Sequence, residues 1–261
     1  MSDRYGIEAV IFDWAGTTVD YGCFAPVNAF DEAFKEFNIE PTMEEIRKPM
    51  GMLKIDHIKT MLEFERIKMA WYKEYGRAYD DEDVKNIYGA FERKLLEGLK
   101  KFSAPKPGVV ELTGYLRENG IKIGSTTGYN DKMMDIVKPA AAELGYEPDL
   151  CITPDSTGGS GRPYPYMIFE NIKAFGIRSV RKVVKAGDTV SDILEGKNAG
   201  VWSVGVIEGS SELGLTDDEF LNLSENERKS QKERVRNSFF EAGADFVVER
   251  ISDIKYLVES L

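Results

Sequence analysis

The stretch Ile7-Glu-Ala-Val-Ile-Phe-Asp-Trp-Ala-Gly-Thr-Thr18 decides the fold of this chain. Its first six residues are mostly apolar, which is typical of a strand covered on both faces in a parallel sheet. Asp13 ends this apolar run, and the small and polar residues after it predict a turn. We therefore expect a buried strand over residues 7–12 that presents a carboxylate at its carboxyl end.

A segment with the pattern of helices follows this turn. Apolar residues recur there at helical spacing in three groups: Phe30, Ala33, Phe34 and Phe37; Ile55, Ile58 and Leu62; and Val84, Ile87, Tyr88, Phe91, Leu95 and Leu99. Thr42 and Glu45 have the spacing of a capping box, which predicts the start of a further helix. We therefore predict that residues 22–102 form an all-helical block inserted just after the first strand.

Strands and helices alternate after the Pro105-Lys-Pro107-Gly108 stretch. Short apolar runs that predict strands lie at 121–125, 150–152, 183–186, 201–207 and 245–248. Such alternation is typical of a parallel sheet with right-handed crossovers. We therefore predict an α/β fold with a doubly wound, Rossmann-like core over residues 1–21 and 103–261 and an inserted helical cap over 22–102. The charged stretch 209–237 is expected to be a helical insertion.

The composition excludes several classes of protein. The 261 residues include 45 acidic and 34 basic side chains, and a net charge of −11 argues against a nucleic-acid-binding or anionic-membrane surface. Two cysteines are too few for a disulfide framework, and no apolar run approaches the ~20 residues of a spanning helix. The chain also starts without a signal-peptide pattern. We expect a cytoplasmic protein that needs a metal or local cations to bind an anionic substrate.

Three polar residues follow predicted strands, namely Asp13, Thr127 and Asp188. Either aspartate alone would more often be a turn or helix-capping residue. Ligands of an open parallel sheet, however, bind beyond the carboxyl ends of its strands. The three residues together therefore predict a single crevice at that edge of the sheet.

These strand-end motifs resemble those of the haloacid dehalogenase superfamily. The superfamily pattern places an Asp after the first strand (Asp13), a Ser/Thr after a second (Thr127), a basic residue (Arg162) and the motif Gly-Asp-x-x-x-Asp, here at 187–192. The resemblance implies that Asp13 attacks phosphorus, that Thr127 donates a hydrogen bond to the phosphoryl oxygens and that Arg162 adds positive charge there. It also implies that Gly128 helps to bind the substrate.

The same resemblance implies a magnesium site. Asp13, the carbonyl group of Ala15 and Asp188 would bind Mg²⁺, and Asp192 would support the site from behind. A hard cation of this kind is needed because a carboxylate that attacks an anionic phosphorus group is otherwise repelled.

Ala15 departs from the superfamily pattern. The usual phosphatase carries a second Asp at this position, which protonates the leaving group and activates water. A methyl side chain transfers no protons, and losing such a group typically costs about 10²–10⁴-fold in rate. Either the protein is a weakened phosphatase or its leaving group is activated in another way.

The run Pro49-Met-Gly-Met-Leu-Lys-Ile-Asp-His57 suggests this other way. It places Lys54 and His57 at i, i+3 on one helical face. This run, the stretch 13–20 and the Gly-Arg-Pro-Tyr-Pro run at 161–165 resemble the phosphonoacetaldehyde hydrolases, the phosphonatase branch of the superfamily. The resemblance implies that Lys54 forms a Schiff base with the substrate aldehyde. It further implies Mg²⁺-dependent cleavage of the carbon–phosphorus bond of phosphonoacetaldehyde, and a homodimer.

Chemistry links Ala15 with Lys54. Breaking a carbon–phosphorus bond expels a carbanion, and an iminium formed on a lysine accepts those electrons as an enamine. Lys54 must be partly neutral to condense, so we expect its pKa to be lowered by desolvation and nearby cationic charge. His57, with an ordinary pKa near 6.5, is the candidate proton shuttle. The sequence leaves open which group activates water for the last hydrolysis.

Several predictions remain open in the sequence. Cys23, Met50 and Tyr129 are candidates to line the substrate pocket, and packing is the alternative reading for each. The aromatic residues of the helical block either pack its own core or form a homodimer contact: Trp71, Tyr72, Tyr75, Tyr88 and Phe91. The rival functions are a phosphatase or sugar-phosphate mutase of the same superfamily, or a non-catalytic scaffold that binds phosphorylated ligands.

Overall fold

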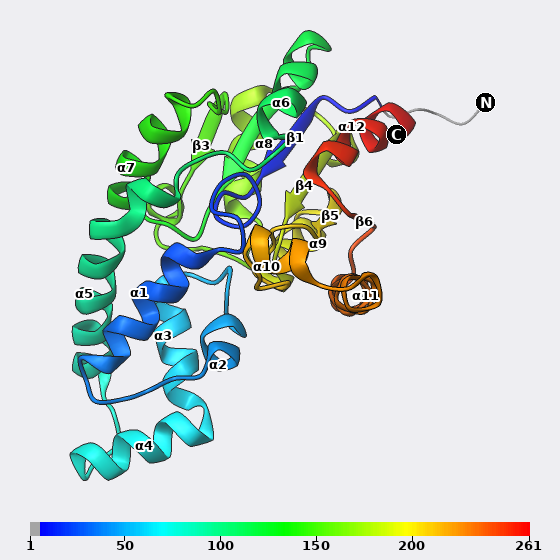
Figure 1. The fold of residues 1–261 in the computed structure, drawn as a ribbon. Helices are drawn as coiled ribbons and strands as arrows, with labels where there is room; N and C mark the ends of the chain where they lie inside the picture. The colour runs from blue at the N-terminus through cyan, green and yellow to red at the C-terminus, as the bar shows by residue number, and fades with distance from the viewer. Residues whose placement is uncertain (1–5) are drawn as a thin grey trace.

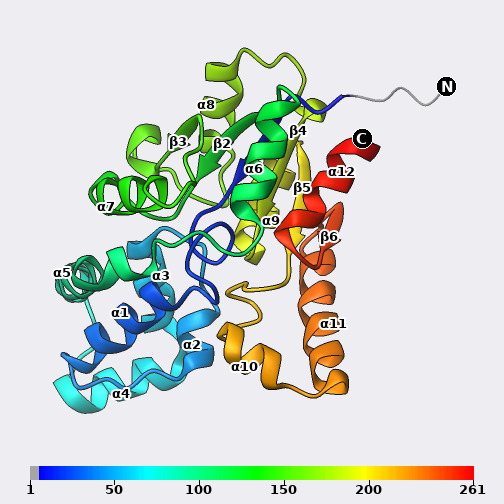
Figure 2. The same cartoon turned by 45° about the horizontal axis from the view of Figure 1, so that its top comes forward.

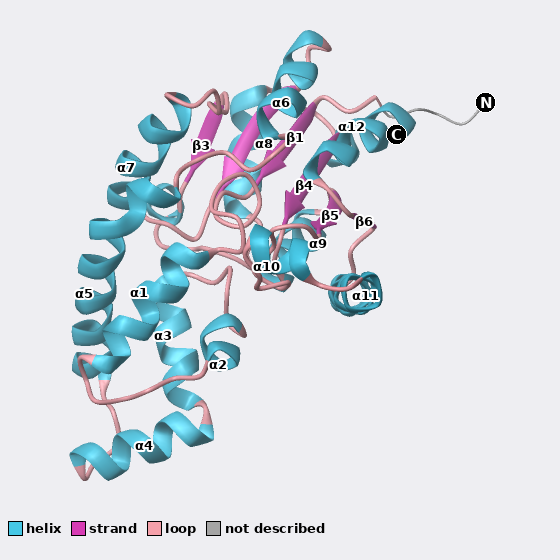
Figure 3. Cartoon of the chain, viewed as in Figure 1, coloured by secondary structure: helices cyan, strands magenta, loops and turns pink. Residues whose placement is uncertain are grey.

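Six parallel strands form the centre of the computed structural model, which describes residues 6–261 (Figure 3). They are β1 (Ala9–Phe12), β2 (Lys122–Thr126), β3 (Leu150–Ile152), β4 (Val183–Gly187), β5 (Trp202–Val206) and β6 (Phe246–Val248). Their order in the sheet is β3-β2-β1-β4-β5-β6. The first strand of the chain is therefore central, the arrangement of a doubly wound sheet, and the predicted fold class is confirmed.

Twelve α-helices surround the sheet or extend from it among the described residues. They are α1 (Phe24–Lys35), α2 (Met43–Arg47), α3 (Lys54–Glu63), α4 (Glu65–Tyr75), α5 (Asp81–Gly98), α6 (Val109–Glu118), α7 (Asp131–Ala142), α8 (Tyr166–Phe175), α9 (Val190–Ala199), α10 (Asp217–Asn222), α11 (Glu225–Glu241) and α12 (Ile254–Ser260). Residues 1–5, which we assigned to the core, lie outside the described residues. No helix over residues 6–261 is long and apolar enough to cross a lipid bilayer.

Both faces of the sheet are covered because β1 is apolar on both sides. Val10 and Phe12 point into a cluster shared with α6, α7 and α12, whereas Ala9 and Ile11 point into a second cluster shared with α8. Successive residues of a strand face opposite sides, so this short run feeds both layers of the core. Figure 2 shows α6 and α12 next to each other on the first face.

Helices α1–α5 form a separate group beyond the carboxyl ends of the strands (Figure 1). Helix α1 packs along α5, and α3 packs on both α4 and α5. The predicted capping box is present, since Thr42 accepts a hydrogen bond from the amide of Glu45 and the Glu45 side chain returns to Thr42. The helices predicted over residues 22–102 are therefore confirmed, and no strand interrupts them.

The aromatic residues of this helical group divide into two sets. Trp71 and Phe91 are buried, and Phe91 stacks on Phe30 with ring centroids 4.1 Å apart. Tyr72 and Tyr75 are exposed on α4, together with Met69. Packing of the group's own core therefore accounts for Trp71 and Phe91, and in part for Tyr75, whose ring lies 4.4 Å from that of Trp71, and for the half-buried Tyr88.

The charged stretch 209–237 is helical from residue 217 onward except for a short break between α10 and α11, whereas residues 209–216 form turns and a loop, so the expected helical insertion is confirmed in part. It contains α10 and most of α11. Only Val235 and Phe239 of α11 are buried, because this helix lies along the surface and touches the core with a narrow stripe.

Candidate active site

The turn after β1 is held against β4 by its backbone. The amide of Asp13 donates to the carbonyl oxygen of Ala186 at 3.0 Å, and the Thr18 hydroxyl donates to the Asp13 carbonyl at 2.9 Å. Gly16 has a φ of +92°, and a Cβ atom there would lie 2.1 Å from Asp188 Oδ2. The turn therefore requires glycine at this position, because a side chain would displace Asp188.

Three carboxylates meet at this turn, from Asp13, Asp188 and Asp192. One oxygen from each lies within 4.8 Å of the others, and all three residues are buried. Asp188 Oδ1 accepts from the Thr17 hydroxyl at 2.8 Å, and Oδ2 accepts from the Ser211 amide at 2.7 Å. Burial, and then the charges of Asp13 and Asp192, raise the pKa of Asp188 well above its ordinary value.

The oxygen donors at this turn fit a magnesium ion. Mg²⁺ prefers carboxylate and carbonyl oxygens, and the raised pKa of Asp188 marks a place where negative charge lacks compensation. Asp192 is engaged elsewhere, since its Oδ1 lies 3.1 Å from Arg162 and 2.8 Å from Lys185. Burial opposes its charge, but these two cations outweigh burial and lower the pKa of Asp192.

Arg162 reaches this crevice from the loop before α8. Its Nη2 donates to Asp13 Oδ1 at 2.6 Å and to Thr126 Oγ1 at 3.0 Å, and its Nε donates to Glu195 Oε2 at 3.0 Å. Burial opposes the charge of the guanidinium, but the carboxylates of Asp13, Asp192 and Glu195 outweigh burial and raise the pKa of Arg162. Arg162 is therefore a fixed positive charge beside Asp13.

The turn after β2 forms another wall of the crevice. Thr127 is buried, and its Oγ1 accepts from the amide of Tyr129 at 3.0 Å. Gly128 lies against the loop before α3, because a Cβ atom there would be 3.0 Å from the carbonyl oxygen of Met52. Tyr129 is also buried, and burial raises the pKa of its hydroxyl well above the ordinary value.

Lys54 reaches the same crevice from the helical group. It is the first residue of α3, it is buried, and its Nζ lies 5.7 Å from the centroid of the Phe30 ring and 5.5 Å from that of the Tyr129 ring. Among the described residues, no carboxylate lies within ion-pair distance of this Nζ. Burial lowers the pKa of Lys54, and the charge of Arg162 acts in the same direction.

A narrow cavity joins the two sides. Its wall contains Asp13, Ala15, Cys23, Gly51, Lys54, Thr127, Gly128, Tyr129, Arg162 and Thr189. Gly51 has a φ of +85°, and a Cβ atom there would lie 2.3 Å from Thr189 Oγ1. The loop before Lys54 therefore rests directly on the loop after β4, and this contact covers one side of the cavity.

His57 and Met50 lie behind this wall rather than in it. His57 stacks on Phe30 with ring centroids 3.9 Å apart, and burial, followed by the charge of Lys54, lowers the pKa of His57 well below 6.5. The expectation of an ordinary histidine pKa is therefore wrong, because the sequence does not show that His57 packs against Phe30 of α1. Met50 is buried as packing. Cys23 does line the cavity, and burial raises the pKa of its thiol well above the ordinary value.

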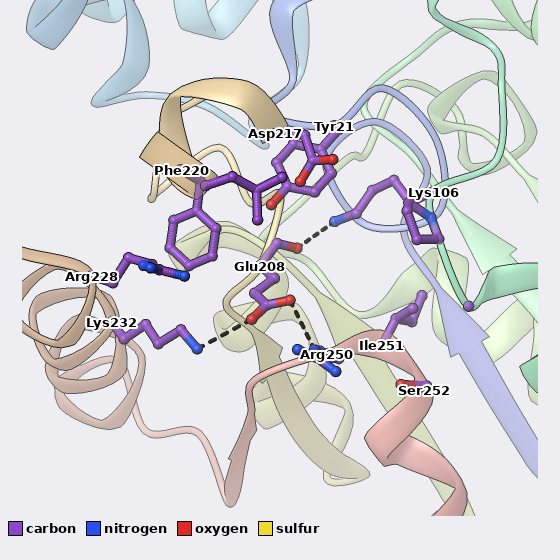
Figure 4. Close-up of a pocket in the computed structure, with 13 residues that line it drawn as sticks. Tyr21, Lys106, Glu208, Asp217, Phe220, Arg228, Lys232, Arg250, Ile251 and Ser252 are labelled. Atoms are coloured by element: carbon purple, nitrogen blue, oxygen red, sulfur yellow. Dashed lines mark hydrogen bonds and ion pairs between the residues drawn. The ribbon is translucent and has the colours of Figure 1, made fainter. Parts of the chain in front are cut away.

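A wider cavity of about 480 Å³ lies beside the crevice, where Lys106 forms part of the wall (Figure 4). Lys232 and Arg250 enter it from α11 and from the segment before α12, and both pair with the Glu208 carboxylate at 3.1 and 3.2 Å. Lys106 Nζ donates to the carbonyl oxygens of Gly16 and Glu208. Lys106, Lys232 and Arg250 therefore already have partners, whereas the buried Nε of Arg228, the fourth cation of the wall, has no hydrogen-bond partner among the described residues.

Sequence reasoning missed three buried charged residues next to the crevice: Lys106, Lys185 and Glu195. Lys106 braces the turn after β1 through the Gly16 carbonyl, and burial lowers its pKa to about 8. Lys185 lies within an apolar strand, which is a detectable signal because lysine is almost never buried without a partner. Glu195 carries no such signal, since a glutamate in a helix is usually solvated.

Comparison with known proteins shows what the chain is similar to. The family profile described as haloacid dehalogenase-like hydrolase matches residues 7–200. A phosphonoacetaldehyde hydrolase of Lysinibacillus sphaericus is 50% identical over 255 residues, which cover 98% of this chain and 95% of that protein. A bifunctional phosphonoacetaldehyde hydrolase/aminoethylphosphonate transaminase of Clostridioides difficile is 52% identical, and the match spans only 40% of that longer protein.

A solved structure has nearly the same fold. The crystal structure of a phosphonoacetaldehyde hydrolase-like protein from Oleispira antarctica superposes with a TM-score of 0.95 at 37% identity. The superposition covers 98% of this chain and 93% of that one. The likeness therefore includes the helical group as well as the sheet.

Proposed function

This chain belongs to the phosphonoacetaldehyde hydrolase family of haloacid dehalogenase-like hydrolases, and we propose on that basis that it hydrolyses phosphonoacetaldehyde to acetaldehyde and phosphate. One observation carries the proposal. Lys54, buried and without a carboxylate partner among the described residues, shares a cavity with Asp13 and with Ala15, where a phosphatase would need a second acid. The site thus offers an amine for the aldehyde and a carboxylate for phosphorus.

The reaction we propose begins at Lys54. Its neutral amine adds to the aldehyde carbon, the resulting hydroxyl group takes up a proton from solution and leaves as water, and a protonated imine remains. Burial favours the neutral amine, and this is the state that condensation requires. His57, the candidate proton shuttle, lies one turn along α3 behind the cavity wall, and burial lowers its pKa, which keeps it neutral and makes it a weak proton acceptor.

Phosphoryl transfer to Asp13 follows. An Asp13 oxygen attacks phosphorus, the carbon–phosphorus bond breaks, and its electron pair moves into the imine to form an enamine on Lys54. Arg162 and Thr127 hold the phosphoryl oxygens, and Gly128 and Tyr129 close the cavity around them. Asp13, the Ala15 carbonyl and Asp188 would hold Mg²⁺, which supplies positive charge to the phosphoryl group when bound, and Asp192 would support them.

Two hydrolyses complete the cycle. The enamine takes a proton at carbon, and water releases acetaldehyde and restores the Lys54 amine. A second water cleaves the aspartyl phosphate and frees Asp13 and phosphate. Since condensation released one water, the balance is one water consumed for each carbon–phosphorus bond cleaved.

The arrangement of the chain fits this division of chemistry. We propose residues 22–102 as a cap that carries Lys54, His57 and Met50, and residues 1–21 and 103–261 as the catalytic core. Cys23 lies next to the first connection between the two. We also propose that the protein acts in the cytoplasm and forms a homodimer through the cap, where Met69, Tyr72 and Tyr75 leave apolar surface exposed on α4.

Borohydride trapping tests the proposal. Reduction during turnover of phosphonoacetaldehyde should attach a two-carbon unit to the peptide that contains Lys54, as measured by mass spectrometry. The Lys54→Arg variant serves as the control, because it keeps the charge and forms no imine. Turnover by the wild-type protein with Lys54 unmodified would refute the imine. Efficient hydrolysis of phosphate monoesters without phosphonoacetaldehyde turnover would favour the phosphatase instead.

A further inference from the structure

Two buried charged residues behind the crevice have no part in the reaction proposed above. Lys185 lies in β4 and Glu195 lies in α9, and the side chain of each is at most 1% exposed. Charged side chains are almost never buried this completely unless they are paired. Their partners therefore show what they do.

Lys185 contacts both acidic residues of α9 that face the sheet. Its Nζ lies 2.8 Å from Asp192 Oδ1 and 3.4 Å from Glu195 Oε2, and it donates to Thr126 Oγ1 at 3.1 Å. The lysine therefore neutralises charge behind the crevice without reaching the cavity, whose wall does not include it.

Glu195 contacts the guanidinium of Arg162 from behind. Its Oε2 accepts from Arg162 Nε at 3.0 Å and from the Thr126 hydroxyl at 2.9 Å. A planar guanidinium held at Nε is restricted in rotation, which fixes the direction of its remaining donors. One of those donors, Nη2, is the group that contacts Asp13 at 2.6 Å.

The charges explain why both residues are needed. Arg162 faces three carboxylates, from Asp13, Asp192 and Glu195, at 2.6 to 3.1 Å. A single cation among three anions would leave a strongly negative pocket, which would repel an anionic phosphoryl group. Lys185 adds the second cation and shares Asp192 and Glu195 with Arg162.

We propose that Lys185 and Glu195 are positioning residues that aim the positive charge of Arg162 at Asp13 and at the phosphoryl group of the substrate. Glu195 sets the orientation of the guanidinium, and Lys185 offsets the negative charge that this orientation brings with it. The predicted loss of kcat rests on the proposed function, whereas the predicted loss of oxyanion binding does not.

Removing the charge of Lys185 tests this pair. Residues that orient a contacting group typically change affinity or activity by about 10–100-fold when they are removed. We expect Lys185→Met to bind inorganic phosphate at least about tenfold more weakly, in calorimetric titrations with Mg²⁺ present, and to lower kcat to a similar extent. Borohydride trapping at Lys54 under saturating phosphonoacetaldehyde should stay at the wild-type level, because the variant keeps the charge of Arg162 and every residue of the cavity wall.

Lys182→Gln is the matched control. Lys182 lies one residue before β4 and forms a half-exposed ion pair with Glu8 at 2.6 Å, so the variant removes the same charge far from the crevice. It should match the wild-type protein in phosphate affinity, kcat and trapping. Lys185→Arg, which keeps the cation, should recover most of the loss.

A second variant covers the case in which Lys185→Met does not fold. The double variant Lys185→Met/Glu195→Gln removes one charge of each sign and leaves no net charge change, and it should bind phosphate more weakly than the wild-type protein. Phosphate affinity within twofold of wild type in the folded variant would overturn the proposal, as would an equal loss in Lys182→Gln. Weakened phosphate binding in a protein that does not turn over phosphonoacetaldehyde would uphold the pair and refute only the proposed function.

Discussion

Arg162 and Lys54 are buried to nearly the same degree, with 5% and 6% of each residue exposed, and they line the same cavity. Burial disfavours the charge of both side chains, yet their pKa values move in opposite directions. Arg162 lies 2.6 to 3.1 Å from three carboxylates, and its pKa is raised. Lys54 has the faces of Phe30 and Tyr129 as near neighbours, and its pKa is lowered.

The difference shows that the groups next to a buried cation, rather than the extent of its burial, decide whether it stays charged. The core side of the cavity surrounds its cation with carboxylates and keeps it charged, which suits the binding of a phosphoryl group. The helical side surrounds its cation with aromatic rings and favours the neutral amine, which suits condensation with an aldehyde. The following predictions test this contrast, from the largest expected effect to the smallest.

Replacing Lys54 by an arginine puts a permanently charged side chain on the helical side of the cavity as well. The Lys54→Arg variant keeps a cation at this position that does not lose its proton, so no imine forms. Carbon–phosphorus cleavage should fall by at least ~10⁴-fold, the upper end of the effect of one proton-transferring group, because the electron acceptor is lost as well. Acetaldehyde release measured with a coupled dehydrogenase would check this, and activity within tenfold of wild type would contradict it.

Removing the metal with a chelator distinguishes the chemistry of the core side of the cavity from that of the helical side. Turnover should drop by more than ~10²-fold in excess chelator, since the phosphoryl group loses its counter-charge. The adduct trapped at Lys54 should persist within a few-fold of its normal yield, because the amine needs no metal. Added Mg²⁺ should restore turnover. Equal loss of turnover and of trapping would show that the amine depends on the metal site.

Placing a carboxylate beside the amine should make Lys54 resemble Arg162. In Ala15→Asp, a new negative charge in the cavity wall raises the pKa of Lys54, so less neutral amine is present at a given pH. An opposite charge nearby shifts a pKa by about 1–3 units, so the rate at neutral pH should fall about tenfold or more and recover as the pH rises. Ala15→Asn, of the same size and without charge, is the control for the pH–rate profile. A rate gain in Ala15→Asp would contradict our account of the missing acid.

Asp20 is a buried acid whose pKa is also shifted by burial, and the prediction for it concerns the stability of the folded protein. Burial raises its pKa from 3.8 to about 7, although it accepts hydrogen bonds from the amides of Phe24 and Ala25. Between pH 4 and 7 the folded protein keeps a proton that the unfolded chain has released, so rising pH reduces its stability. Asp20→Asn is free of this loss. The melting temperature of the variant relative to wild type should rise by a few degrees over that range and stay constant above it. A difference in melting temperature that does not change with pH would contradict the raised pKa of Asp20.

The strand-end residues could be predicted because topology alone brings them together. Asp13, Thr127 and Asp188 follow strands that are neighbours in a parallel sheet, and each strand is visible as an apolar run. The partners of Arg162 could not be predicted in this way. Thr126 and Glu195 are 69 residues apart, and their contact depends on how α9 packs on β4 and β5, for which the sequence has no local signal.

The helical side was harder to predict at the level of side chains. The spacing of apolar residues in α3 predicts a helix, and the motif around Lys54 predicts a reactive amine. The stacking of His57 on Phe30 depends on the packing of α1 against α3, and so does the direction of the histidine pKa shift. Patterns along the chain indicate which face of a helix is apolar, but not which ring a histidine meets there.

The missing side chain of Gly51 has a further consequence. Because a single carbon atom there would collide with Thr189 Oγ1 and with Ser191, the two loops meet with less clearance than the diameter of a water molecule. If Asp13 is phosphorylated as we propose, this contact shields the acyl phosphate from bulk solvent on the side of the two loops. A side chain introduced at residue 51 would push the two loops apart, so this shielding depends on the absence of a single carbon atom.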